Sequence, residues 1–93
     1  MSTREQQIQY WLTAAKKDLP VMDHLFEKGD YPWALFIGHL VLEKMLKALY
    51  VRNIGKVPPY KHSLILLAKK AKLSLNDEQK KDFETFTNFN IEA

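Results

Sequence analysis

The sequence predicts an all-α fold, an antiparallel up-and-down bundle of about four helices. Apolar residues recur at helical spacing in two long segments, and no segment shows the alternating pattern of a strand. Only three Gly and four Pro are available for tight turns. With 93 residues, 46% of them hydrophobic and 27% charged, the composition is that of one soluble globular domain over residues 1–93.

The first predicted helix covers residues 3–28. Pro20 lies inside this segment and predicts a kink, because proline lacks an N–H and crowds the preceding turn. Gly29 suits the end of this helix, and Asp30 suits the N-cap of the next one. The apolar residues that follow each other at steps of four and three along one face are Ile8, Leu12, Ala15, Leu19, Met22 and Phe26.

The second predicted helix covers residues 31–53 and is apolar on nearly every face. Such a helix is buried on more than one side, so it either lies at the centre of a bundle or contacts another chain. Its one polar stripe consists of His39, Glu43 and Lys47 at steps of four, with Lys44 beside it. Glu43 before Lys47 is the favourable order for a helical ion pair.

A loop with two adjacent prolines separates this helix from a short third one. Ser63 is the predicted N-cap of the third helix, since its hydroxyl can accept a hydrogen bond from the first turn. The spacing predicts that one face is buried and the other exposed. The residues expected inside are Leu64, Leu67, Ala68 and Ala71, and those expected outside are Lys69, Lys70 and Lys72.

Asn76 and Gln79 have the spacing of a capping box and predict the start of a fourth helix. The residues that this helix places at steps of three, as in a packed core, are Phe83, Phe86 and Phe89. The segment carries no stop signal, which leads us to expect that the natural chain continues past Ala93.

Positive charge is concentrated in the middle of the chain. Residues 43–75 carry eight Lys/Arg and one Asp/Glu, a net charge of +7, whereas the whole chain carries +3. A basic segment attracts phosphates, and a solvated lysine surface is the alternative interpretation.

Several site classes and locations are excluded by composition. The absence of Cys excludes disulfides and thiolate metal sites, and it weakly favours a reducing compartment. No glycine-rich phosphate loop or metal-spaced cluster occurs, so we expect no cofactor, apart from a magnesium ion that arrives with a nucleotide. No apolar run approaches the roughly 20 residues of a membrane span, and no signal peptide is evident, so we expect a cytoplasmic protein.

Short motifs occur along the chain in a specific order. Trp-x3-Ala-x2-Asp-Leu at 11–19 is followed by Gly-Asp-Tyr-x2-Ala-x-Phe at 29–36. Leu-Glu-Lys-x-Leu-Lys-Ala-Leu at 42–49 comes next, and a proline-rich loop then leads to His-Ser-Leu at 62–64. Together they resemble the HEPN family, a nucleotide-binding helical domain of higher eukaryotes and prokaryotes. The resemblance extends from Trp11 to the end of the chain.

The resemblance implies a helical bundle that dimerises, often beside a minimal nucleotidyltransferase and in some relatives as the toxin of a toxin–antitoxin pair. Many HEPN proteins are metal-independent ribonucleases with an Arg followed by four to six residues and a His. Here nine residues separate Arg52 from His62, so this motif is not matched within the chain and we expect no ribonuclease activity from these 93 residues. The tail at 89–93 is similar to a segment that in relatives continues into Arg-Tyr-Pro.

The predicted function is therefore a dimeric, non-catalytic module that binds nucleotides or RNA phosphates and acts with a minimal nucleotidyltransferase. We expect residues 31–51 to contribute to the dimer interface. One alternative is a ribonuclease toxin whose catalytic arginine lies beyond residue 93. Another is a purely structural dimerisation bundle without a ligand. The neighbouring reading frame would separate these alternatives, since a small nucleotidyltransferase there favours the first two.

The candidate ligand-binding residues combine the polar stripe of the second helix with the basic loop after it. Lysines offer point charges for phosphate, and a tyrosine ring beside them suits a base. For Lys47 the alternative is an ion pair with Glu43, and for His39 it is a hydrogen-bonded place in the core. The sequence leaves open whether stripe and loop are close. The candidates are His39, Lys44, Lys47, Tyr60, Lys61 and His62.

Overall fold

The computed structural model describes residues 3–60 and 63–92, with the side chains of the last helix described as far as Thr87. These residues form four helices and no strand, which confirms the predicted all-α bundle. The elements are α1 (Arg4–Glu27), α2 (Tyr31–Ile54), α3 (Leu64–Lys70) and α4 (Asp77–Glu92). No helix among the described residues is long and apolar enough to cross a membrane.

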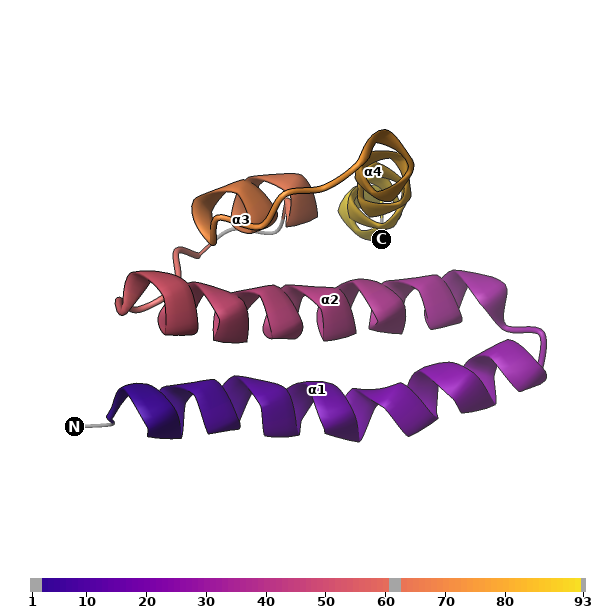
Figure 1. The fold of residues 1–93 in the computed structure, drawn as a ribbon. Coiled ribbons are helices and arrows are strands. Elements are labelled where there is room, and N and C mark those ends of the chain that lie inside the picture. Colours follow the sequence, from indigo (N-terminus) through magenta and orange to yellow (C-terminus); the bar gives the residue numbers. More distant parts are fainter. Residues whose placement is uncertain (1–2, 61–62, 93) are drawn as a thin grey trace.

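Helix α2 is the central layer of the molecule. It runs antiparallel to α1 on one side, while α3 and α4 lie on its other side, and α4 is seen nearly end-on (Figure 1). The central position explains why α2 is apolar on nearly every face, because it is covered from two directions. Of the two alternatives for α2, a central helix or a helix facing another chain, the structure shows the first within a single chain.

The helix ends follow the local rules that the sequence indicated. The backbone at Gly29 and Gly55 is left-handed, with φ of 80° and 78°, which is the conformation that glycine adopts freely after a helix. Asp30 is the N-cap of α2, as predicted, but its side chain makes no capping hydrogen bond, and a proline stands in the first turn. Helix α1 continues through Pro20 as an unbroken α-helix.

The caps of α3 and α4 are confirmed. The backbone N–H of Leu66 donates to Ser63 Oγ over 3.3 Å at the start of α3. Before α4, Gln79 N–H donates to Asn76 Oδ1 and Asn76 N–H donates to Gln79 Oε1, so the capping box is reciprocal. These caps fix where α3 and α4 begin and therefore which face of α3 carries the lysines after Ser63.

The core lies between α2 and the pair formed by α3 and α4. Leu64, Leu67, Ala68 and Ala71 are fully buried, and Lys69, Lys70 and Lys72 are exposed, as the α3 pattern predicted. Partly buried Phe83 and Phe86 pack against this cluster, while the Phe89 side chain lies outside the described part.

Gly38 allows α4 to approach α2 closely. A Cβ atom at this position would lie 2.8 Å from Phe86 Cε1 and 3.3 Å from Met22 Sδ. The absence of a side chain therefore lets an aromatic ring from α4 and a methionine from α1 meet over the middle of α2.

Candidate functional site

The polar stripe of α2 is buried. His39, Glu43 and Lys47 have exposed fractions of 0%, 7% and 7%, although each bears a polar or charged group. Burial of such groups is costly unless they are paired, so their partners decide what the stripe does.

The stripe is a chain of two side-chain contacts centred on Glu43. Lys47 Nζ donates to Glu43 Oε2 over 3.0 Å, and His39 Nε2 lies 3.3 Å from Glu43 Oε1. An ionised carboxylate only accepts, so a hydrogen bond between His39 Nε2 and ionised Glu43 requires the proton on Nε2. His39 Nδ1 is buried and has no hydrogen-bond partner among the described residues. Both alternatives given to the stripe from sequence, the ion pair of Lys47 and the buried place of His39, are therefore present in the structure.

Two aromatic rings from outside α2 complete the environment of Lys47. Its Nζ lies 5.1 Å from the centre of the Trp11 ring on α1 and 5.7 Å from the centre of the Tyr60 ring in the loop. Both distances are within the range of cation–π attraction. The loop therefore does return to the polar stripe, at Tyr60, which the sequence could not establish.

Tyr60 differs from the rest of this cluster in its exposure. Its side chain is 89% exposed, whereas Lys47 beneath it is almost completely covered. A molecule in solution can therefore contact the Tyr60 ring directly, whereas Lys47 and His39 are covered.

Lys44 has a separate partner. Its Nζ donates to Asp18 Oδ2 on α1 over 2.6 Å, and both side chains are about three-quarters buried. Lys44 thus links α2 to α1 and not to the loop. Lys61 and His62 lie outside the described residues.

Sequence reasoning missed the α1 partners of these lysines, Trp11 and Asp18. A signal was present, because residues about equally far from the turn at 29–31 face each other in an antiparallel hairpin. Trp11 and Lys47 satisfy this condition, as do Asp18 and Lys44. Among the described residues, no group of three or more His, Cys, Asp or Glu is arranged to hold a metal ion.

Comparison with known proteins gives one positive finding. The family model of the HEPN domain matches residues 8–93, which is nearly the whole chain. No curated protein and no solved structure matches the chain at a significant level.

Proposed function

We propose that this chain, which belongs to the HEPN domain family, binds a nucleotide or the phosphates of an RNA beside Tyr60. Family membership supports a nucleotide- or RNA-related module in general. The main observation in support of the proposal is the Tyr60 ring. It is 89% exposed, and its centre lies 5.7 Å from the Lys47 ammonium group. An open aromatic face offers a stacking surface for a base, and the cation–π contact with Lys47 helps to hold the ring in position.

The candidate residues have different roles in this proposal. Tyr60 contacts the ligand. Lys47 positions the Tyr60 ring through the cation–π contact, and Lys47 stays hydrogen-bonded to Glu43. His39 is fully buried, so it supports Glu43 instead of touching the ligand. Lys61 and His62 follow Tyr60 in the sequence and complete the proposed ligand set. Lys44 acts only through the α1–α2 contact.

We further propose a homodimer that uses part of α2. HEPN domains often dimerise, and Tyr31, Trp33 and Met45 of α2 are about half or more exposed in the single chain. Phe26 of α1 lies beside Tyr31, with ring centres 5.3 Å apart, and is 64% exposed. Exposed apolar groups of this kind are typical of a surface that meets a partner. The proposed partner in the cell is a minimal nucleotidyltransferase, with the complex in the cytoplasm.

Sedimentation velocity at micromolar concentration tests the dimer. We expect a dimer for the natural chain and a monomer for Trp33→Glu, because the charge would have to be buried at the contact. A well-behaved monomer of the natural chain would contradict the proposed dimer.

A purely structural dimerisation bundle is the second candidate function. It is favoured by one observation, that Lys47 and Glu43 are hydrogen-bonded to each other and buried. In this alternative the stripe only holds α1, α2 and the loop together. The ribonuclease toxin stays an alternative that depends on an arginine beyond residue 93, and it gains no support from His39, whose side chain is inaccessible.

Titration of ATP and of a short single-stranded RNA at low ionic strength separates ligand binding from the structural alternative. We expect Tyr60→Ala to weaken binding about tenfold or more through loss of stacking, and Tyr60→Phe to retain it. The matched control is Val57→Ala, since Val57 lies in the same loop and is 76% exposed. Absence of binding by the natural chain, or equal affinity of all variants, would contradict the proposed function.

A further inference from the structure

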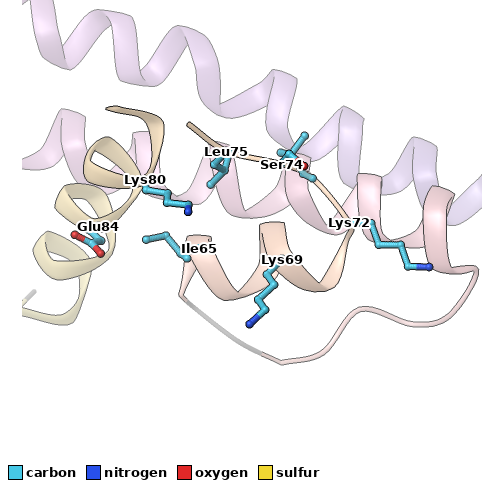
Figure 2. Close-up of a pocket in the computed structure, with 8 residues that line it drawn as sticks. Ile65, Lys69, Lys72, Ser74, Leu75, Lys80 and Glu84 are labelled. Atoms are coloured by element: carbon cyan, nitrogen blue, oxygen red, sulfur yellow. The ribbon is translucent and has the colours of Figure 1, made fainter. Parts of the chain in front are cut away.

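A groove between α3 and α4 brings together three lysines that the polar stripe does not include. It has a volume of about 730 Å³, and Figure 2 shows its lining residues on the two helices and the segment between them. Lys69 comes from α3, Lys72 from the first turn after it, and Lys80 from α4. The apolar lining is supplied by Ile65, Leu73 and Leu75.

The three groove lysines have no ion-pair partner among the described residues, and all three are exposed. The cations of α2 differ in this respect, since Lys44 is paired with Asp18 and Lys47 with Glu43. With three lysines against one carboxylate, that of Glu84, the concave surface carries a net positive potential. Such a potential favours a ligand that carries several negative charges.

The directions of the side chains indicate the shape of that ligand. Lys80 reaches from α4 towards Ile65, Lys69 projects away from α3, and Lys72 stands apart from both (Figure 2). Their ammonium groups therefore do not converge on one point. A chain of phosphates fits this arrangement better than a single phosphate, because successive charges can meet successive lysines.

The backbone conformation of Lys72 is a second observation that favours a ligand in the groove. Its φ is 63°, and it is the one described non-glycine residue with a positive φ. Lys72 N–H donates to Lys69 O and Leu73 N–H donates to Ala68 O, which is the hydrogen-bond pattern that ends a helix with a left-handed residue. Glycine is the usual residue at this place because it adopts the conformation without strain. A lysine at this position keeps the backbone strained, but it adds a charged side chain to the lining of the groove.

From these observations we infer that the α3–α4 groove binds a single-stranded RNA segment, with its phosphates on the lysines and a base against the apolar lining. This inference rests on the proposed function and assigns it a second contact surface, distinct from Tyr60. Glu84 also lines the groove and repels phosphate, so we expect the phosphate contact of Lys80, which lies on the same helix, to be weaker than those of Lys69 and Lys72.

The test compares two triple variants of equal charge in fluorescence anisotropy with a labelled single-stranded RNA. The groove variant carries Lys69→Gln, Lys72→Gln and Lys80→Gln. The control variant replaces three exposed lysines outside the groove, namely Lys16, Lys70 and Lys81, by Gln. We expect the groove variant to lose affinity about a hundredfold at low salt and the control variant to lose less than about threefold. Circular dichroism checks that both variants keep their helices.

The possible results distinguish failure of the groove proposal from failure of the proposed function. Equal losses in the two triple variants would overturn the groove and leave only general charge attraction. An unchanged groove variant together with a loss in Tyr60→Ala would overturn the groove and leave the proposed function standing. Absence of RNA and ATP binding by the natural chain would overturn both. Equally tight binding of a polyglutamate peptide at the groove would also overturn the inference, because it would show recognition of charge without RNA.

Glu84 provides a test in the opposite direction. Glu84→Gln removes the repelling charge from the groove, so we expect RNA affinity to rise about threefold. Asp82→Asn is the matched control, since Asp82 is exposed on the same helix outside the groove. An equal rise in both variants, or no rise in Glu84→Gln, would contradict a phosphate path along this groove.

Discussion

The lysines of α2 and the lysines of the α3–α4 groove differ in their partners and in their exposure, although Lys44, Lys47, Lys69 and Lys72 all belong to the basic segment 43–75. Lys44 and Lys47 each contact a carboxylate and are mostly buried. Lys69, Lys72 and Lys80 are exposed and have no ion-pair partner among the described residues. The first group holds helices together, and the second group leaves a positive surface open to a ligand.

A local excess of charge in the sequence therefore does not indicate a binding surface until the ion-pair partners of each charged side chain are known. The net charge of +7 over residues 43–75 counts Lys47 and Lys69 equally. In the structure, the charge of Lys47 is matched by Glu43, so it adds little to the external potential. The charge of Lys69 is not matched in this way, so its full attraction for phosphate remains.

The largest expected effect comes from breaking the buried pair of α2. Lys47→Met removes the cation that donates to Glu43 and lies between Trp11 and Tyr60. We expect the free energy of unfolding to fall by about 3 kcal/mol, because a buried carboxylate loses its charged partner. Urea denaturation followed by circular dichroism measures this change.

The control for this prediction replaces both partners. Glu43→Leu combined with Lys47→Met removes both charges, so we expect it to recover most of the lost stability. A loss below about 1 kcal/mol in Lys47→Met would show that the pair does not hold the fold, and the distinction between the two lysine groups would fail.

A smaller effect on stability is expected for the ion pair between Lys44 of α2 and Asp18 of α1. Lys44→Met and Asp18→Asn, alone and together, form a double-mutant cycle whose coupling energy we expect to be about 1 kcal/mol. The pair is only partly exposed, so the coupling should persist at moderate salt. A coupling energy near zero would assign the link between the two helices to apolar packing alone.

The smallest expected effect separates stability from binding at one residue. Lys72→Gly relieves a left-handed backbone at φ 63°, so we expect the protein to gain about 0.5 kcal/mol of stability. The same variant loses a groove cation, so its RNA affinity should fall. Thermal unfolding and RNA titration of this variant check both directions, and a loss of stability would contradict the interpretation of the strained backbone.

Much of the fold could be predicted from local sequence signals. The caps at Ser63 and Asn76, the glycines that end α1 and α2, and the buried face of α3 all follow from spacing and residue type. These features depend on neighbours within a few residues, and such neighbours are visible in the sequence.

The candidate site could be predicted only in part. Spacing within one helix indicated the Glu43–Lys47 pair, which the structure contains. The contacts of Lys47 with Trp11 and Tyr60 join segments far apart in sequence, so they depend on helix packing and on the path of the loop. The groove joins Lys69 and Lys80 across the α3–α4 crossing, and no periodicity within either helix encodes that crossing.

The salt dependence of RNA affinity distinguishes the groove lysines, which we expect to bind phosphate, from the α2 cluster, which we expect to act through Tyr60. Each phosphate contact on a single strand contributes about −0.7 to the slope of log affinity against log salt. We therefore predict a slope shallower by about 2 in the Lys69→Gln, Lys72→Gln, Lys80→Gln variant, and an unchanged slope with weaker binding in Tyr60→Ala. A slope in the groove variant equal to that of the natural chain would contradict this division of roles.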